Sequence, residues 1–390
     1  MKSRRTVAVV LSALFAVASL FAQTWTNTGP GGVAPSIACS ADGTKLVAVG
    51  FPGPAYTSTN SGASWITNTG GYITAVAASA DGNTFVICSN LIVIYVSTNA
   101  GLNWTSNSAF AAPGVSSLAM SADGTRVVAA GAGKFAMTSG HIYTSTNTGA
   151  TWTQTAAPLD TWTSVACSAD GNKIVAVSQD GRIETSMNFG LNWATNDSFA
   201  PRMLQWASVA SSASGDHLVA AAIAESAAFG AVYTSSDSGV SWTSNNVPRA
   251  EWWSVASSAD GEKLVADYQN GTYIYTSGDG GFTWSSNSIP GISTWTCASS
   301  ADGGALAVGA ASGIWTYRTN SPPHLTVKPS GGNLDLSWII PSTNFVLQQS
   351  LNLASWQTLT NAPMLNFTNL EDEVFLVPSN HSAFFRLSSP

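Results

Sequence analysis

A four-residue phrase recurs along most of this chain at nearly constant spacing. Ser-Ala-Asp-Gly occurs six times and the variant Ser-Ala-Ser-Gly once, and successive copies begin 39 to 47 residues apart. The copies begin at Ser40, Ser79, Ser121, Ser168, Ser212, Ser258 and Ser300. A period in this range is typical of repeat architectures, in which each unit is one supersecondary element stacked on its neighbours. The repeat therefore constrains the shape of the protein strongly and its chemistry very little.

A second phrase follows each of the first six copies. It reads Ser-x-Asn/Asp-x-Gly-x-x-Trp, and its tryptophans are Trp65, Trp104, Trp152, Trp193, Trp242 and Trp284. The Asn or Asp side chain can accept backbone N–H groups two residues further on. The glycine supplies a positive φ, and the tryptophan can pack its apolar face beside the turn. We therefore expect a second tight turn in every unit.

Short apolar runs of β-type composition lie between the two phrases. Asp-Gly between such runs is a strong hairpin signal. In one unit we expect strands at residues 163–167, 173–177, 182–185 and 192–195. Four short strands with two tight hairpins are typical of one blade of a β-propeller, so the sequence predicts an all-β fold.

The seventh unit is split between the two ends of the repeat region. Residues 314–317 match the third strand of the other units, but no second phrase follows them. Residues 25–28, Trp-Thr-Asn-Thr, match the missing fourth strand. We expect the N-terminal strand to complete the last blade and close a seven-bladed ring, which removes exposed sheet edges.

These two phrases resemble the Asp-box (BNR) repeat of sialidase-like and sortilin-like propellers, and their spacing is similar to the photosystem II assembly-factor type. The resemblance covers about residues 23–319. It implies the propeller fold, but no particular activity, since the family mixes hydrolases with binding scaffolds.

Beyond Pro322-Pro323 the repeat gives way to a different pattern. Alternating strands follow, with Trp338 in one of them and the pair Phe384-Phe385 in the last. They resemble a shortened fibronectin type III module, which implies a small β-sandwich. The predicted organisation is a signal peptide at 1–22, the propeller at 23–320 and the sandwich at 321–390.

The composition excludes some classes of partner. Only 9% of the residues are charged, against about 25% in a typical soluble domain, and the net charge is −7. This balance argues against a nucleic-acid groove and against binding to an anionic membrane surface. We expect a monomer that uses no cofactor and meets a glycan or a secreted or cell-surface protein.

The first 22 residues predict export. Lys2, Arg4 and Arg5 precede an apolar run at 7–21, and cleavage after Ser19 or Ala22 fits a secretory signal. Removing these cations would make the net charge −10. We expect a secreted, periplasmic or cell-surface protein with no membrane insertion after signal removal.

The four cysteines, Cys39, Cys88, Cys167 and Cys297, predict small buried thiols. A Cys39–Cys297 disulfide between neighbouring blades is the alternative. No pair has the spacing of metal ligands, so no metal site is expected.

The end of the blades opposite the Asp-Gly phrases carries the more individual loops. Trp162, Trp206 and Trp252 hold one equivalent position there, at the start of the inner strand. Two interpretations stand: an aromatic arc that stacks on a ligand such as a sugar ring, or packing residues between blades. The candidate ligand-binding residues are Trp162, Trp206, Trp252, Trp253, Trp295, Arg202 and Arg249.

The sequence contains no complete catalytic set. The arginine motif that grips a sialic acid carboxylate is absent, and we find no Ser/His/Asp grouping and no phosphate loop. Weak candidates for a two-carboxylate glycosidase are Asp160, Asp180, Glu225, Glu251 and Asp267. We therefore expect a non-catalytic binding propeller. The alternatives are a secreted glycoside hydrolase and a purely structural cell-surface protein.

Overall fold

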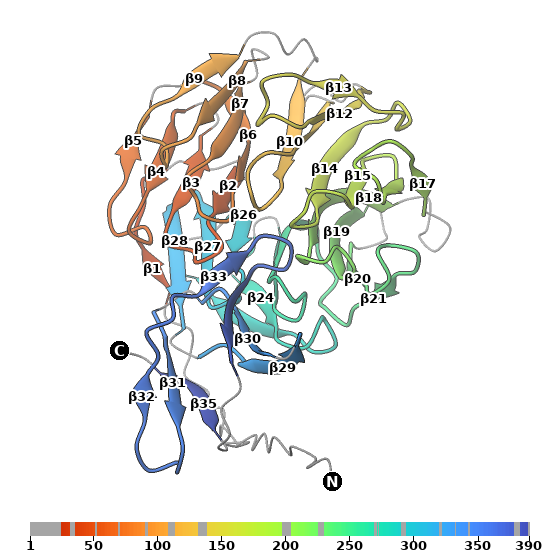
Figure 1. Ribbon diagram of the computed structural model, residues 1–390. Helices are drawn as coiled ribbons and strands as arrows, with labels where there is room; N and C mark the ends of the chain where they lie inside the picture. The colour runs from red at the N-terminus through yellow and green to blue at the C-terminus, as the bar shows by residue number, and fades with distance from the viewer. Residues whose placement is uncertain are drawn as a thin grey trace.

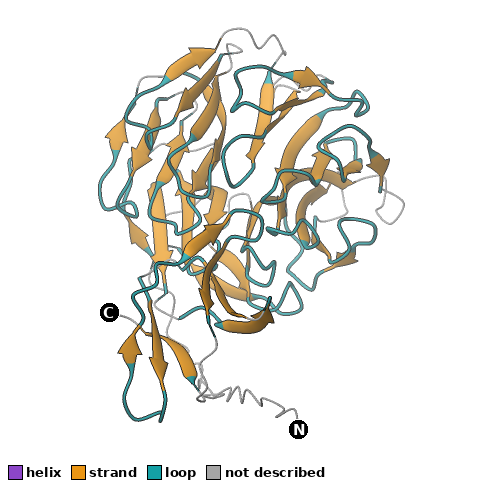
Figure 2. Ribbon diagram, viewed as in Figure 1, coloured by secondary structure: helices purple, strands orange, loops and turns teal. Residues whose placement is uncertain are grey.

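The computed structural model describes residues 25–388 apart from short gaps, and the side chains of Ala224, Thr294 and Trp295 are also outside the description. The gaps are 32–35, 51–52, 69–70, 90–92, 108–113, 132–138, 197–203, 225–229, 269–270, 272, 290–293, 320–321, 332, 342–343 and 378–382. The regular structure of the described part is β-strand, joined by turns and loops (Figure 2).

Seven four-stranded antiparallel sheets are formed by the described residues up to Arg318. Figure 1 shows them arranged around a common centre, as in a propeller. In chain order, sheet 1 is β2 (Ser36–Cys39), β3 (Leu46–Val49), β4 (Ala55–Ser58) and β5 (Ile66–Thr67); sheet 2 is β6 (Ile73–Ala78), β7 (Phe85–Ser89), β8 (Ile94–Ser97) and β9 (Thr105–Asn107); sheet 3 is β10 (Val115–Met120), β11 (Val127–Gly131), β12 (Ile142–Ser145) and β13 (Thr153–Gln154); sheet 4 is β14 (Trp162–Cys167), β15 (Ile174–Ser178), β16 (Ile183–Ser186) and β17 (Ala194–Thr195).

The next two sheets continue this order. Sheet 5 is β18 (Leu204–Ser211), β19 (Leu218–Ala224), β20 (Val232–Ser235) and β21 (Thr243–Ser244); sheet 6 is β22 (Trp252–Ser257), β23 (Leu264–Tyr268), β24 (Tyr273–Ser277) and β25 (Ser285–Ser288).

Sheet 7 combines the two ends of the repeat region. It contains β26 (Thr294–Ser299), β27 (Ala305–Ala310) and β28 (Gly313–Arg318), and its fourth strand is β1 (Thr26–Asn27). The register places Thr26 opposite Thr316. Trp25, next to β1, is buried with residues of sheets 6 and 7 and stacks at a tilt on Tyr317, with 5.6 Å between ring centroids.

The Ser-Ala-Asp-Gly phrases form tight turns, here named the Asp-Gly turns, between the first and second strands. In sheet 2 the Ser79 hydroxyl donates to Asp81 Oδ1 (2.6 Å), which also accepts the Asn83 backbone N–H (2.9 Å). Burial by itself raises the pKa of the Asp81 carboxyl, but the hydrogen bonds from Ser79 and Asn83 outweigh it and lower the pKa. Gly82 takes the positive φ of 60° that completes the turn. The aspartate is therefore an ionised structural group.

The Ser-x-Asn/Asp-x-Gly-x-x-Trp phrases form the turns between the third and fourth strands, here named the Ser-Trp turns. In sheet 2 the Ser97 hydroxyl accepts the Gly101 N–H (2.9 Å), and Asn99 Oδ1 accepts the Asn103 N–H (2.9 Å). Trp104 Nε1 donates back to the Gly101 carbonyl (3.0 Å). Ala100 also has a positive φ, 56°, so two successive residues take the left-handed conformation.

The two kinds of turn are bonded to each other within each of sheets 1 to 6. In sheet 1 the Ser61 N–H donates to the Thr44 carbonyl at 2.7 Å, and the same bond recurs in the other five sheets at 2.7–2.9 Å. Both turns therefore lie at the same end of the sheets, here named the Asp-Gly end. The other end is the loop-rich end.

A circuit of backbone hydrogen bonds links the seven Asp-Gly turns. The alanine of each turn donates its N–H to the alanine carbonyl of the next sheet at 2.7–2.8 Å, and the last bond returns from Ala301 to Ala41. The members of this alanine ring are Ala41, Ala80, Ala122, Ala169, Ala213, Ala259 and Ala301. Their methyl groups form one apolar cluster at the centre.

Side chains add two further series of bonds between sheets. Inner-strand serines accept the backbone N–H of the following sheet; Ser164, for example, accepts from Val209 at 3.2 Å. At the Asp-Gly end, cations reach the next turn: Lys45 Nζ donates to the Asp81 carbonyl (2.8 Å) and Lys263 Nζ to the Asp302 carbonyl (2.7 Å). Arg318 donates to the Gly43 carbonyl and so links sheet 7 to sheet 1.

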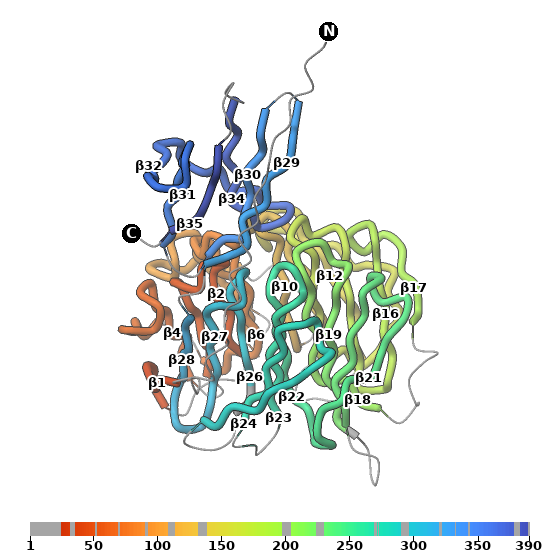
Figure 3. Tube along the Cα trace, turned by 90° about the horizontal axis from the view of Figure 1, so that it is seen from below, coloured from red at the N-terminus to blue at the C-terminus, as the bar shows by residue number. Residues whose placement is uncertain are grey.

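The C-terminal module (residues 325–388) contains two small sheets. One is β29 (Thr326–Ser330), β30 (Asn333–Ile339), β34 (Glu371–Leu376) and β33 (Met364–Asn366); the other is β32 (Gln357–Thr358), β31 (Val346–Ser350) and β35 (Phe384–Ser388). Leu336, Trp338 and Val374 of the first sheet share a buried cluster with Leu347 of the second. Figure 3 shows the module at one end of the ring of sheets. Ile339, Ile340 and Leu370 pack against the alanine ring, which identifies this as the Asp-Gly end.

The four cysteines are free thiols, so the alternative of a Cys39–Cys297 disulfide is wrong. Cys39 Sγ contacts the Ser299 carbonyl at 3.2 Å, whereas Cys297 Sγ lies 3.4 Å from the Ser254 hydroxyl. Burial raises the pKa of the Cys39, Cys88 and Cys167 thiols to about 12. In the described part of the chain we find no helix of the length and apolarity needed to cross a membrane.

Replacing Arg126 by alanine tests the cationic links. Arg126 donates to the Asp170 carbonyl of the next sheet (3.1 Å) and lies over the Phe189 ring, 5.0 Å from its centroid. We expect Arg126→Ala to lower the free energy of unfolding by about 1–3 kcal/mol, because a charged hydrogen bond and the packed stem are both lost. Chemical denaturation measures this, with Lys328→Ala on exposed β29 as control. Equal stability of the two variants would contradict it.

Candidate functional site at the loop-rich end

The three equivalent tryptophans lie at the loop-rich ends of the inner strands. A β-bulge follows each of them, as between Trp162 and Ser164 in β14. The exposed fractions of Trp162, Trp206 and Trp252 are 1%, 1% and 0%. Each ring belongs to an apolar cluster made with the sheet on one side.

Both the faces and the polar atoms of these rings have partners inside the protein. Trp206 meets Tyr233 edge-on with 5.3 Å between centroids, and its Nε1 donates to the Gly181 carbonyl at 3.1 Å. Trp162 and Trp252 donate in the same way to the carbonyls of Pro158 and Pro248, each at 3.2 Å. The burial supports the packing interpretation, since a fully covered ring has no face free to stack on a sugar.

The bulged residue after each tryptophan position differs between sheets. Thr74, Ser116 and Thr163 in sheets 2 to 4 each donate to two carbonyls, one in their own sheet and one in the next. Sheet 6 has Trp253 at this position, and its ring is half-buried. A tryptophan here replaces a hydroxyl that ties two sheets together.

Two exposed charged residues, Arg249 and Glu251, lie in the loop that leads to Trp253. Among the described candidate residues, this loop combines exposed charged side chains with a half-buried aromatic ring. Arg202, Glu225 and the side chain of Trp295 lie outside the described residues.

Asp160 and Asp180 are brought together in sheet 4. Asp160 is 5% exposed, its Oδ1 accepts the Thr161 N–H at 2.7 Å, and its Oδ2 lies 2.8 Å from Arg182 Nε. Burial raises the pKa of the Asp160 carboxyl, and the contact with Asp180 raises it further, against the opposing effects of Thr161 and Arg182. Two carboxylates close to each other repel, which favours the protonated form of one of them.

Glu184 joins this group and was not among the sequence candidates. It is 1% exposed, lies 3.6 Å from Arg182 Nη1, and accepts the Thr195 hydroxyl at 2.6 Å. The sequence does hold a signal, because the five other complete repeats have a tyrosine at the same strand position: Tyr56, Tyr95, Tyr143, Tyr233 and Tyr275. One guanidinium thus pairs with two carboxyl groups, those of Asp160 and Glu184.

Asp267 in β23 is isolated from the other candidates. It is 0% exposed, and neither of its oxygens has a well-directed hydrogen-bond partner within the described part of the chain. Burial raises the pKa of the Asp267 carboxyl to about 8, although the nearby Ser254 backbone opposes the shift. The carboxyl is therefore mostly protonated at neutral pH and packs as a polar group in an apolar interface.

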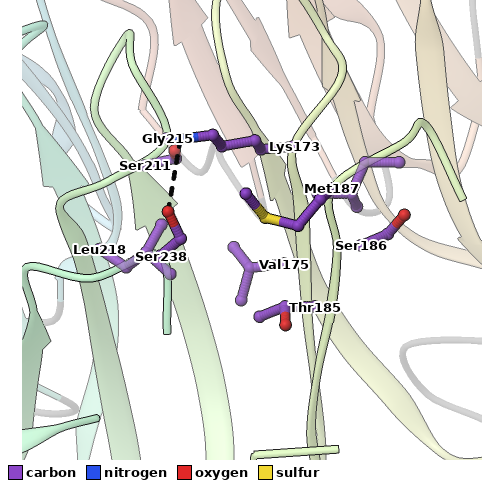
Figure 4. Close-up of a pocket in the computed structure, with 10 residues that line it drawn as sticks. Lys173, Val175, Thr185, Ser186, Met187, Ser211, Gly215, Leu218 and Ser238 are labelled. Atoms are coloured by element: carbon purple, nitrogen blue, oxygen red, sulfur yellow. Dashed lines mark hydrogen bonds between the residues drawn. The ribbon is translucent and has the colours of Figure 1, made fainter. Parts of the chain in front are cut away.

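Two cavities among the described residues are lined by none of these candidate residues. One of about 10 Å³ lies between sheets 4 and 5, where Lys173 Nζ lies 3.4 Å from the Ser238 hydroxyl and Met187 covers the gap (Figure 4). Such a volume holds no more than about one water. A larger cavity of about 160 Å³ lies at the alanine ring and is bordered by Leu370. Among the described residues no cluster of His, Cys, Asp and Glu could hold a metal ion.

Replacing Asp267 tests its buried, protonated state. The folded carboxyl binds its proton up to about pH 8 and the unfolded one only to about pH 3.8. This contribution to stability is full below pH 4 and is lost as pH rises toward 8, with a slope of up to about 1.4 kcal/mol per pH unit.

We expect Asp267→Val to remove that slope and to stabilise the protein at pH 7 by about 1–3 kcal/mol. Valine occurs at the same register position in sheets 1 and 4, as Val49 and Val177. Denaturation between pH 4 and 9 measures both effects, and Asp267→Asn controls for the charge alone. An unchanged slope in both variants would contradict the assignment.

Comparison with known proteins gives similarity of structure alone. No protein-family model matches the sequence, and no curated protein matches it. A GH74 xyloglucanase from Xanthomonas campestris superposes with a TM-score of 0.61 at 16% identity, covering 81% of this chain and 59% of the enzyme. The chain thus spans less than two thirds of that enzyme's length.

Two further solved structures are similar in the same way. A GH74 enzyme from Niastella koreensis gives a TM-score of 0.61 at 15% identity, over 87% of this chain and 68% of the enzyme. YCF48 bound to D1 peptide gives 0.58 at 13% identity, over 83% of this chain and all of that protein. At such identities the likeness shows the fold, so this chain has the repeated four-stranded sheets of a β-propeller.

Proposed function

We propose that this chain is a secreted, non-catalytic Asp-box propeller that binds a glycan or a protein partner through its loop-rich end. In this proposal the seven sheets are the blades of a closed ring, completed by β1, and the C-terminal module is a small β-sandwich. The pairing of β1 with β28 and the complete circuit of alanine hydrogen bonds support closure.

The position of the C-terminal module is the observation that favours the loop-rich end as the binding surface. Ile339, Ile340 and Leu370 pack on the alanine ring at the Asp-Gly end. A ligand that approaches the centre of the ring from that end meets the module first. The loop-rich end is left for a partner, and loops on a rigid scaffold are where binding residues concentrate.

The placement of the carboxylates favours binding over hydrolysis. Glycosidases hold their two carboxyl groups about 5–5.5 Å or about 6.5–9.5 Å apart. Asp160 instead is paired with Arg182 at 2.8 Å, and the nearby Asp180 raises the pKa of its carboxyl. Asp267 is fully buried, whereas Glu251 is an exposed residue of a loop. The surroundings of Asp160 and Asp267 therefore suit structural roles better than catalysis.

Variants of the loop before β22 test the binding surface. The three buried tryptophans are unsuitable, because a Trp→Ala change in a core costs about 3–5 kcal/mol. We expect Arg249→Glu and Trp253→Ala each to weaken ligand binding at least tenfold. Binding is measured on a glycan array that includes xyloglucan fragments, and against peptides, the ligand classes named for the similar structures.

The control is Leu191→Ala, which changes a side chain 76% exposed on a Ser-Trp turn at the other end. Melting temperatures check that every variant folds. Binding that is lost equally in the control would contradict the assignment to the loop-rich end. A chain that binds nothing in either screen supports the structural cell-surface alternative.

A glycoside hydrolase is the second candidate, favoured by one observation. The raised pKa of Asp160 beside Asp180 is the property of a catalytic acid. If this function holds, the protein releases reducing sugar from xyloglucan, and Asp160→Asn lowers the rate at least 100-fold. Glu371→Gln in the C-terminal module is the control. We expect no release above background from the unaltered chain.

A further inference from the structure

The alanine ring presents an unusual surface at the Asp-Gly end. Its backbone N–H and C=O groups are used in the circuit of hydrogen bonds, so the ring offers methyl groups to whatever lies above it. The cavity of about 160 Å³ lies at the ring, and its walls include Cys39, Met120 and Cys167 at equivalent positions of three sheets, together with serines that neighbour the alanines. A surface with its polar groups already satisfied favours an apolar partner.

Leu370 of the C-terminal module meets this surface in a strained conformation. It has a positive φ of 59°, which is rare for a bulky side chain and is commonly taken by glycine or asparagine. Its N–H donates to the Asn366 carbonyl (2.9 Å), and its carbonyl accepts the Ile340 N–H (3.0 Å). The bonds hold the β33–β34 turn beside the end of β30, so Leu370 and Ile340 face the ring together.

Unlike Leu353, which also has a positive φ but is 52% exposed, Leu370 packs against another part of the protein. Strained residues persist where the surrounding structure fixes them, and they often mark functional contacts. Leu370 borders the cavity and packs on the alanine cluster. Glycine has no side chain and asparagine a polar one, so neither could make this apolar contact.

We propose that the alanine ring is a docking site for apolar side chains and that the C-terminal module is its resident plug. Leu370 is the central contact, and Ile339 and Ile340 flank it. The module closes the ring at the Asp-Gly end, and the linker through Pro322-Pro323 keeps it at high local concentration. The plug does not depend on what the loop-rich end binds.

Cleavage of the linker in the folded chain tests the plug. A site for a specific protease is inserted between Ser321 and Pro322 of the full chain, which is purified, cut and run on a sizing column. We expect the two pieces to elute together at micromolar concentration. With Leu370→Asp we expect them to separate, because a carboxylate would be buried against the methyl groups of the alanine ring.

Two further variants separate docking from folding. Leu370→Asn suits the positive φ, so we expect the module to stay folded while docking weakens at least tenfold. Val377→Asp places the same charge on a side chain that is 84% exposed in the module, and we expect it to stay docked. Circular dichroism and melting check the fold of each variant.

The proposal is overturned if the unaltered module separates once the linker is cut, or if Leu370→Asp and Leu370→Asn remain as tightly docked as the unaltered chain. Ligand binding by Arg249 and Trp253 variants is measured separately, so failure of the plug and failure of the loop-rich binding surface give different results.

Discussion

The circuit of hydrogen bonds between the seven alanines is the constraint on which the remaining structure depends. A buried backbone N–H needs a partner, and here each finds it in the next sheet. Every Asp-Gly turn must therefore sit at one fixed position relative to its neighbours. Serine and aspartate shape the turn, glycine takes the positive φ, and alanine is small enough for seven side chains to converge. Each residue of the repeated phrase thus has its own physical role.

Regularity at one end leaves the other end free to vary. The Asp-Gly end has the alanine ring, the cationic links and the module that covers its centre. At the loop-rich end the bulged residue changes from Thr163 in sheet 4 to Trp253 in sheet 6, and a carboxylate cluster forms around Arg182 in sheet 4 alone of the described sheets. A partner that recognises this protein specifically would find its asymmetry there.

Local patterns predicted the strands well and the site poorly. In sheet 4 strands were expected at 163–167, 173–177, 182–185 and 192–195, and the observed ones begin and end within two residues of these bounds. The repeat also showed that Trp162, Trp206 and Trp252 are equivalent, but equivalence does not say whether a ring faces solvent or the next sheet. Asp267 likewise lies within a predicted strand, but whether its side chain is buried depends on the sheet packed against it.

The sequence by itself determined the turns, the strand order within each sheet and the pairing of the two ends of the repeat. These follow from hydrogen bonds between residues close in sequence and from a pattern repeated seven times. Only the tertiary structure decided that the tryptophans are buried, that Asp160 meets Asp180, and that Leu370 covers the alanine ring. The tryptophan contacts join neighbouring repeats and the Leu370 contact joins two modules, whereas Asp160 and Asp180 meet across loops of a single repeat. No local pattern encodes which of these surfaces meet.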